Sequence, residues 1–290
     1  MRVAFIGFGE VGQTLASDLQ ARGITDLTAW DVLFARTDSN PYRAAAGTIQ
    51  TNRSAGEALQ GADVVISAVT AEQCIAAAKE AAQYMPQSAY FLDLNSVSPQ
   101  SKRDAATHLA TGRGLYVEAS VMAPISPKRI ASPILLGGPH ARAFIGIANS
   151  LGMAGATFYS DTLGKAAAAK MCRSVMIKGL ESLLSESLLT ARHNGVERDV
   201  LESLQNLLPA TDWTQLSRYM ISRSLRHGRR RAEEMREAAL SVREAGIDPQ
   251  MSNASALRQD WAASLGVDPA TPTLEAMLDA MLRASGELRC

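Results

Sequence analysis

The stretch Val3-Ala-Phe-Ile-Gly7-Phe-Gly9-Glu-Val-Gly12 decides how this chain begins to fold. A short apolar run opens directly into Gly-x-Gly-x-x-Gly, and residues 13–19 continue with the pattern of a helix. Strand, glycine turn and helix in that order are typical of a βαβ unit that binds a dinucleotide, with the pyrophosphate at the helix N-terminus. We therefore expect a group of six adjacent residues to contact the cofactor: Gly7, Phe8, Gly9, Glu10, Val11 and Gly12.

A second expected strand, residues 27–30, ends at Asp31. An acidic residue at this place can bind the ribose hydroxyls of the adenosine, and its charge repels the additional phosphate of NADP. Arg36 follows closely and would offset that repulsion if its loop folds over the ribose. The sequence thus favours NAD as the cofactor and leaves NADP open.

Composition places the chain among ordinary globular proteins. Its 290 residues are enough for two domains, and 47% of them are hydrophobic and 20% charged. Because 29 basic residues balance 29 acidic ones, there is no general attraction to nucleic acid or to an anionic membrane. Cys74, Cys172 and Cys290 lie far apart, which favours a reducing compartment and no metal site. The first expected strand leaves no room for a signal peptide, and no apolar run approaches the ~20 residues of a membrane span, so we expect a cytoplasmic protein.

Strand-like and helix-like segments alternate through the first half of the chain, as in a doubly wound sheet. Further strands are expected at residues 62–69, 89–94, 115–118, 134–136 and 156–159. Ligands of such sheets bind beyond the C-terminal ends of the strands. Position alone makes Val69, Thr70, Asn95 and Ser96 candidate cofactor contacts, although the ordinary polarity of these loops explains any single one of them equally well.

From Asp161 onward the pattern is helical. Ser160-Asp161 is placed to cap a long helix over residues 162–193, which Asn194-Gly195 would end. Because this helix is apolar on most sides, it favours a buried link between two domains and a place in a dimer interface. Shorter helices are expected near residues 197–208, 211–226, 229–245, 251–264 and 271–285. The expected fold is α/β: a Rossmann doubly wound sheet domain, residues 1–160, followed by an all-α domain, residues 161–290, that the long helix enters.

The first turns of that helix carry Lys170, the residue best suited to chemistry. Its spacing from Ser174, Ile177 and Glu181 places all four on one helix face. A lysine on a mostly apolar helix needs an explanation, because burying an unpaired ammonium group is costly. A pair with Glu181, or a side chain that reaches solvent, would explain it without any role in catalysis.

Four segments in order resemble the β-hydroxyacid dehydrogenases, the family of 6-phosphogluconate and 3-hydroxyisobutyrate dehydrogenases. Residues 7–12 are similar to its glycine turn, and residues 93–99, Asp-Leu-Asn-Ser-Val-Ser-Pro, to its cofactor loop. Residues 118–124, Glu-Ala-Ser-Val-Met-Ala-Pro, are similar to its substrate loop, and residues 164–174 to its catalytic Gly…Lys-x-x-x-Asn helix. Within the family, the segment 170–174 indicates a divergent branch of 6-phosphogluconate-dehydrogenase-like proteins.

The resemblance implies an NAD- or NADP-dependent enzyme that acts on CH–OH, oxidising a β-hydroxy acid or reducing its oxo form. Lys170 would be the catalytic general acid and base, and as a base it needs a pKa well below the ordinary value of about 10.4, through burial or a neighbouring cation such as Arg173. The residues implied to contact the substrate are Ser120, Met122, Ala123, Pro124 and Ser174.

Two departures from the family pattern affect the expected substrate pocket. The catalytic-helix asparagine is replaced by Ser174, and Ser-Gly-Gly has become Met122-Ala123-Pro124. Proline has no N–H, so at least one backbone donor is lost. We expect a less polar pocket than is usual in the family, with any anchor for the substrate carboxylate shifted to an arginine.

Residues 226–231, Arg-His-Gly-Arg-Arg-Arg, form a basic run. A nucleic-acid patch is one interpretation, but acidic residues follow at four-residue offsets, which is typical of a solvated helix face. In the family this region helps to close the active site, sometimes that of the partner subunit. Arg229, Arg230 or His227 would then replace the charge of a missing family lysine, and Arg230 is our candidate substrate contact.

Three other functions stay open at this point. An imine reductase has the same architecture but usually lacks the lysine, and a decarboxylating sugar-acid dehydrogenase needs polar contacts that Met122-Ala123-Pro124 do not provide. A nicotinamide-binding sensor would bind the cofactor without turnover. As partners we expect a small-molecule substrate and a second copy of the chain, with the long helix and the C-terminal domain at the interface, and neither nucleic acid nor a membrane.

Overall fold

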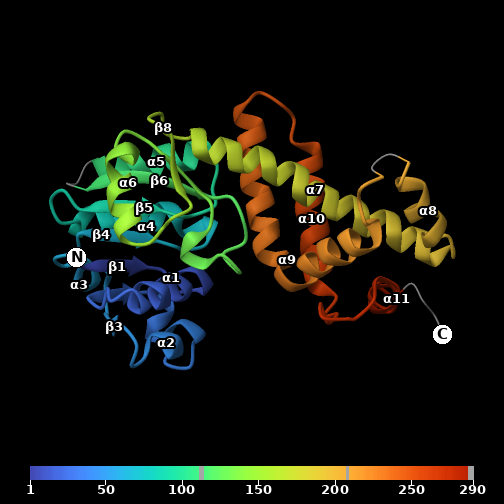
Figure 1. Cartoon of the computed structure of the whole chain (residues 1–290), viewed down its shortest axis with the longest axis horizontal. Helices are drawn as coiled ribbons and strands as arrows, with labels where there is room; N and C mark the ends of the chain where they lie inside the picture. The colour runs from blue at the N-terminus through green and yellow to red at the C-terminus, as the bar shows by residue number, and fades with distance from the viewer. Residues whose placement is uncertain (111–113, 207–208, 287–290) are drawn as a thin grey trace. The chain divides into compact units, whose positions relative to one another are not determined.

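The computed structural model describes residues 1–110, 114–206 and 209–286 (Figure 1). The chain divides into two compact units, Met1–Met171 and Cys172–Cys290. Each unit is described by itself below. One helix, α7 (Lys165–His193), contributes its first turns to the first unit and the rest to the second.

The first unit is built on an eight-stranded sheet with the order β3-β2-β1-β4-β5-β6-β7-β8. Its strands are β1 (Val3–Ile6), β2 (Leu27–Trp30), β3 (Gln50–Thr51), β4 (Val64–Ser67), β5 (Tyr90–Asp93), β6 (Leu115–Val121), β7 (Ile134–Gly137) and β8 (Ala156–Ser160). All neighbours are parallel except β6 and β7. The strand order reverses direction between β1 and β4, and this switch point is where open α/β sheets bind their ligands. The predicted doubly wound sheet is confirmed, with the short β3 as an addition.

Apolar residues fill both faces of this sheet, which explains the nearly continuous hydrophobic runs of its strands. In β1 the fully buried Val3 and Phe5 join one apolar cluster, while Ala4 and Ile6 join another. Helices α1 (Glu10–Ala21) and α6 (Ala141–Ser150) contribute to the first cluster, and α4 (Cys74–Tyr84) and α5 (Pro99–Ala110) to the second. The remaining helical segments are α2 (Asn40–Ala45), α3 (Ala55–Leu59), η1 (Val32–Ala35), η2 (Ala71–Gln73) and η3 (Arg129–Ala131).

The second unit consists of helices. After the shared α7 come α8 (Glu197–Leu204), α9 (Trp213–Glu244), α10 (Gln250–Ser264) and α11 (Leu274–Ala284). Its core joins side chains of α7, α9 and α11, among them Leu188, Ile221 and Met277. No strand follows β8 in the described part of the chain, as the sequence predicts. None of the helices described has both the length and the apolar character needed to cross a bilayer.

Helices α7 and α9 differ from the sequence prediction. Helix α7 begins at Lys165 rather than near residue 162, because the Ser160 hydroxyl accepts a hydrogen bond from Thr162 N (3.0 Å) in a local turn, and Gly164 follows with φ +89°. The two helices expected over residues 211–226 and 229–245 form one helix, α9, with a kink at His227. The break is confined to that residue, so the helix resumes at once. Residues 207–208, at the expected end of α8, lie outside the described residues.

Candidate cofactor and active site

The glycine turn after β1 leaves a backbone-lined space at the start of α1. Gly7 has φ +88°, and an added Cβ there would lie 2.5 Å from the Ala68 carbonyl oxygen. A Cβ on Gly12 would lie 2.6 Å from the Gly7 carbonyl oxygen, whereas a Cβ on Gly9 would meet nothing within 4 Å. Gly9 is also the N-cap of α1 and offers no side-chain cap, so the first N–H groups of the helix are available to an anion. These features fit the pyrophosphate of a dinucleotide.

The other residues predicted in this turn take different positions. The Phe8 side chain is 2% exposed and belongs to the apolar core, so only its backbone faces the turn. Glu10 is exposed in the first turn of α1, and Val11 is partly buried against the core.

Asp31 ties the glycine turn to the end of β2. Its Oδ2 accepts a hydrogen bond from Phe8 N (2.7 Å), and its Oδ1 accepts one from Leu33 N (2.8 Å). Because a carboxylate has about four lone-pair sites, further acceptor capacity remains for ribose hydroxyls. Arg36 pairs with Asp38 (3.6 Å), and both of these side chains are exposed.

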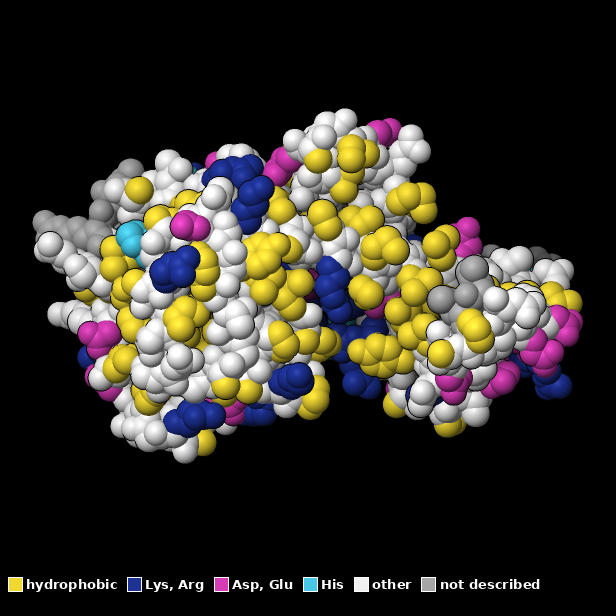
Figure 2. All heavy atoms as spheres, turned by 45° about the horizontal axis from the view of Figure 1, so that its top comes forward, with side chains coloured by type: hydrophobic (Ala, Val, Ile, Leu, Met, Phe, Trp, Pro, Cys, Tyr) yellow, Lys and Arg dark blue, Asp and Glu magenta, His cyan; other side chains and the backbone are white. Residues whose placement is uncertain are grey.

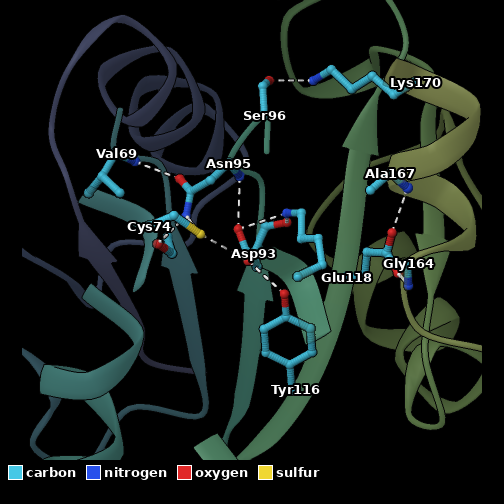
Figure 3. A network of polar contacts seen from close by, with 12 residues as sticks. Val69, Cys74, Asp93, Asn95, Ser96, Tyr116, Glu118, Gly164, Ala167 and Lys170 are labelled. Atoms are coloured by element: carbon cyan, nitrogen blue, oxygen red, sulfur yellow. Dashed lines mark hydrogen bonds and ion pairs between the residues drawn. The ribbon is translucent and has the colours of Figure 1, made fainter. Parts of the chain in front are cut away.

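A buried polar network lies at the C-terminal end of β5 (Figure 3). Asp93 is fully buried, and its Oδ1 forms an ion pair with Lys102 Nζ (2.9 Å) while its Oδ2 accepts a hydrogen bond from the Tyr116 hydroxyl (2.6 Å). Lys102 Nζ also donates to the Asp93 carbonyl oxygen (2.8 Å). Burial, and the nearby charge of Asp93, raise the pKa of Tyr116, which therefore donates as a neutral hydroxyl. Burial also raises the pKa of the Cys74 thiol, whose Sγ contacts the same carboxylate at 3.7 Å.

This network fixes the loop that carries Asn95 and Ser96. Asp93 Oδ1 accepts from Asn95 N (2.9 Å), Asn95 Oδ1 accepts from Val69 N (2.8 Å), and Asn95 Nδ2 donates to Ser67 Oγ (2.9 Å). Through these hydrogen bonds the Asn95 side chain, which is 4% exposed, joins the ends of β4 and β5. Ser96 is less buried and stands next along the chain, and Thr70 beyond β4 is exposed.

Lys170 lies against that loop. Its Nζ donates to Ser96 Oγ over 2.5 Å, so two segments that the sequence singled out separately meet in space (Figure 3). The start of α7 is fixed by Glu118 of β6, which accepts hydrogen bonds from Gly164 N (2.6 Å) and Ala167 N (2.5 Å). Glu118 is fully buried, and this burial raises its pKa. The predicted cap Ser160-Asp161 is therefore wrong, and the cap is a carboxylate from a distant strand.

The predicted substrate loop follows β6. Ser120 is 1% exposed within the strand, Met122 and Ala123 are partly exposed, and Pro124 is exposed. The Met122 N–H donates to the Pro133 carbonyl oxygen (2.8 Å), and Pro124 has no N–H. Of Met122, Ala123 and Pro124, two thus offer no backbone donor to a ligand.

In the second unit, Ser174 belongs to a chain of polar contacts between α7 and α9. Its Oγ accepts from Lys178 Nζ (3.3 Å), and Lys178 Nζ forms an ion pair with Glu234 Oε2 (2.5 Å). Burial lowers the pKa of Lys178, and the Glu234 carboxylate opposes this shift. Arg230, our candidate substrate contact, is 44% exposed and lies 3.9 Å from Glu234 in the predicted four-residue pair.

Glu181 belongs to an adjacent cluster in this unit. Its carboxylate accepts two hydrogen bonds from the Arg231 guanidinium and one from Gln259 Nε2 (3.0 Å). The sequence left open a pair between Glu181 and Lys170; in this structure Arg231 and Gln259 bind Glu181, and Lys170 Nζ donates to Ser96 Oγ.

The sequence missed Lys102, Tyr116 and Lys178, together with the capping role of Glu118. A signal existed for Lys102, which shares a helical face with the apolar Ala106 and Leu109 at offsets of four and seven residues. A charged residue on such a face indicates a buried ion pair. Lys178 and Tyr116 carry no local signal of this kind.

Known proteins similar to this chain include NAD-binding enzymes, in agreement with a dinucleotide site at the glycine turn. Residues 2–160 match the NAD binding domain of 6-phosphogluconate dehydrogenase, and residues 191–261 match a domain of unknown function, DUF1932. The NAD-dependent L-serine dehydrogenase of Pseudomonas aeruginosa is 26% identical over 73% of this chain and 71% of its own length.

Solved structures cover nearly the whole chain. A conserved hypothetical protein from Sinorhizobium meliloti 1021 is 35% identical, with a TM-score of 0.76 over 98% of this chain and 96% of its own. A conserved protein of unknown function, described as structurally similar to 3-hydroxyacid dehydrogenases, is 32% identical, with a TM-score of 0.70 over 98% of this chain and 99% of its own. At 19% identity, a 3-hydroxyisobutyrate dehydrogenase of Mycobacterium tuberculosis (TM-score 0.69) and an imine reductase of Streptomyces aurantiacus (TM-score 0.56) share the fold, each over 97% of this chain and 99% of their own. The chain belongs to the β-hydroxyacid dehydrogenase family, as a divergent branch whose N-terminal region is the NAD-binding domain of 6-phosphogluconate dehydrogenases.

Proposed function

We propose that this protein is a dehydrogenase that transfers a hydride between a nicotinamide cofactor and a β-hydroxy acid, or its oxo form, with Lys170 as the general acid and base. The observation that carries the proposal is the 2.5 Å contact between Lys170 Nζ and Ser96 Oγ. It places an amine next to the loop beyond the C-terminal end of β5, on the side of the sheet where cofactors of this fold bind.

The nicotinamide supplies the hydride acceptor or donor when it is bound. The chain supplies binding and proton transfer. The glycine turn and the first N–H groups of α1 would hold the pyrophosphate. During oxidation Lys170 Nζ takes the proton of the substrate hydroxyl, and during reduction it returns a proton to the oxo oxygen. Ser96 holds the Lys170 amine in place for both directions.

We propose NAD as the preferred cofactor. The Asp31 carboxylate is held by Phe8 N and Leu33 N at the end of β2, so its charge stays where an additional phosphate on the ribose would have to sit. The similarity to a dehydrogenase that is NAD-dependent supports this choice. NADP would be accommodated only if Arg36 left Asp38 to neutralise that phosphate.

The substrate class we propose is a β-hydroxy acid. L-Serine carries its hydroxyl on the carbon β to the carboxylate, and a relative named for that substrate matches most of this chain. We assign residues 1–160 to cofactor binding and residues 161–290 to substrate binding and dimerisation. We propose Met122, Ala123 and Pro124 as apolar substrate contacts, and Ser120 and Arg230 as further substrate contacts.

We also propose that a second copy of the chain covers the helical unit. A groove of about 480 Å³ between α7 and α10 is lined by Leu183, Met251, Leu257 and Trp261. Leu183 is 56% exposed and Leu257 70% exposed. Figure 2 shows hydrophobic side chains, in yellow, on the surface of this unit. Exposed apolar patches of this kind are typical of protein interfaces.

Absorbance of the reduced nicotinamide tests the function. The wild-type protein is given NAD or NADP with L-serine, 3-hydroxyisobutyrate and 3-hydroxypropionate, and the reduced cofactors with the oxo acids and with cyclic imines. We expect the highest kcat/KM with NAD and a β-hydroxy acid. Turnover of imines alone would make the protein an imine reductase, and tight cofactor binding without any turnover would make it a sensor.

A further inference from the structure

Lys178 is a buried cation on the same helix as Lys170. The two lysines and Ser174 follow each other at four-residue intervals, so they succeed one another along one side of α7. Ser174 is 7% exposed and Lys178 is 5% exposed. An ammonium group at this depth needs partners, because its desolvation is costly.

The partners of Lys178 come from two helices. Its Nζ lies 2.5 Å from Glu234 Oε2 of α9 and 3.3 Å from Ser174 Oγ of α7. Glu181 and Arg231, which bind each other, are the other charged groups that act on it. The ammonium is therefore held from the side of α9, with Ser174 as its contact along α7.

The hydrogen bond from Lys178 makes the Ser174 hydroxyl an acceptor, unlike the hydroxyls of the neighbouring serines of the helix. Ser182 and Ser185 donate to the carbonyl oxygens of Lys178 (2.9 Å) and Glu181 (2.8 Å), four residues earlier in the chain, as helical serines commonly do. Ser174 instead accepts from Lys178, because an ammonium group can only donate. One lone pair of the Ser174 oxygen is thereby used, and the Ser174 hydroxyl can still donate its own proton to another acceptor.

We propose that Lys178 is a positioning residue that fixes the Ser174 hydroxyl as a hydrogen-bond donor, and that this hydroxyl binds a carboxylate oxygen of the substrate. The positive charge behind the hydroxyl favours an anionic acceptor over a neutral one. Ser174 stands one helical turn from Lys170, so it can orient an acid whose hydroxyl reaches that lysine. This inference rests on the proposed function, and it adds the Ser174 hydroxyl as the group that favours an acid over a neutral substrate.

The test compares an acid with its neutral ester. The probes are L-serine and L-serine methyl ester with NAD, and the variants are Ser174→Ala, Lys178→Met and the double variant. We expect each single change to raise KM for L-serine about tenfold, the factor that corresponds to the loss of one hydrogen bond to a charged group. The KM for the ester and the kcat for both probes should change much less, because Lys170 remains in place.

The double variant shows whether Lys178 acts through Ser174. If it does, Lys178→Met raises KM for L-serine in the wild-type background and has little further effect once Ser174 is alanine. Lys178→Arg keeps the cation and should recover most of the preference for the acid. Lys165→Met removes an exposed lysine of the same helix and should change neither constant.

Thermal unfolding and NADH titration establish that each variant folds. Should Lys178→Met fail to fold, Ser174→Ala is compared with Ser174→Thr, which keeps the hydroxyl and should keep the preference for the acid. The inference alone would be overturned if Ser174→Ala and Ser174→Thr had the same ratio of KM for L-serine to KM for the ester. It would also be overturned if the effects of Ser174→Ala and Lys178→Met on KM for L-serine were additive in the double variant. A wild-type protein that neither binds nor oxidises any β-hydroxy acid would overturn the proposed function and the inference with it.

Discussion

Ser96 and Lys170 are 74 residues apart in the chain, yet Ser96 Oγ accepts a hydrogen bond from Lys170 Nζ over 2.5 Å. The loop that carries Ser96 is fixed by the buried Asp93, and the helix that carries Lys170 is fixed by the buried Glu118. Two fully buried carboxylates thus set the geometry of the proposed acid and base.

Removing the Ser96 hydroxyl should lower kcat without abolishing activity. Ser96→Ala leaves the amine of Lys170 in the chain but removes the group that orients it, and a hydrogen bond to a charged partner corresponds to about a tenfold change or more in rate. Steady-state kinetics with NAD and L-serine measure the effect. An unchanged kcat would show that Ser96 does not orient the amine during turnover.

Gly9 and Gly12 should respond differently to the same substitution. Gly12→Ala places a Cβ 2.6 Å from the Gly7 carbonyl oxygen and should lower the melting temperature, whereas Gly9→Ala meets no protein atom within 4 Å. We expect Gly9→Ala to keep the stability and to raise the Kd for NADH at least tenfold, because its methyl group occupies the space of the pyrophosphate. Differential scanning fluorimetry and fluorescence titration separate the two effects. An unchanged Kd for Gly9→Ala would place the cofactor elsewhere.

Glu118→Gln should destabilise the first unit. A glutamine oxygen accepts one of the two hydrogen bonds from Gly164 N and Ala167 N, and an unpaired buried N–H costs about 1–3 kcal/mol. Burial raises the pKa of Glu118, so the native state binds its proton more tightly than the unfolded state does. The contribution of this group to the stability of the wild type therefore falls as pH rises from the unfolded pKa of Glu118 through its raised folded value.

Urea unfolding of the wild type and Glu118→Gln over a range of pH measures this difference. Because the other titrating groups are common to both proteins, the stability gap between them should narrow as pH rises. A gap that widens with pH would mean that the ionised form of Glu118 is the one the fold stabilises.

Lys102→Met should cost about 3–5 kcal/mol of unfolding free energy, because it leaves the Asp93 carboxylate buried without its cation. The matched control is Arg36→Met, which breaks the exposed pair with Asp38 and should cost less than about 1 kcal/mol. Chemical denaturation measures the free energy of unfolding of both variants. Equal losses of unfolding free energy would contradict a buried ion pair at Asp93.

Leu257→Asp should weaken self-association. The side chain is 70% exposed beside the groove between α7 and α10, so a charge there is harmless to the monomer and unfavourable in an apolar interface. Analytical ultracentrifugation should show a dimer for the wild type and a shift toward the monomer for the variant. A wild type that sediments as a monomer at all concentrations would exclude this interface.

The secondary structure was largely predictable from the sequence because its signals are local. Strands β1, β4 and β5 are buried on both faces, so their sequences are short apolar runs. The turn after β1 needs glycine at Gly7 and Gly12, where a Cβ would lie too close to a backbone oxygen. The same holds for the end of α7, where Gly195 has φ +71° as a helix terminator.

The polar contacts of the candidate site could not be predicted, because each joins residues far apart in the chain. Glu118 accepts a hydrogen bond from Gly164 N, 46 residues later and directly before α7, so the nearer Ser160-Asp161 looked like the cap. The partner of Lys178 is Glu234, on another helix, and no spacing rule relates the two. Residue type and position suggested Lys170 and Ser96 separately, and only the fold brings them into contact.

The most direct test of the central claim is the rate of NAD reduction by Lys170→Ala, with Lys165→Ala of the same helix as its control. We predict that Lys170→Ala lowers kcat for the best β-hydroxy acid at least about 100-fold while the Kd for NADH stays the same, and that Lys165→Ala retains full activity. A Lys170→Ala variant that turns over at the wild-type rate would contradict the account and leave Lys170 a structural lysine.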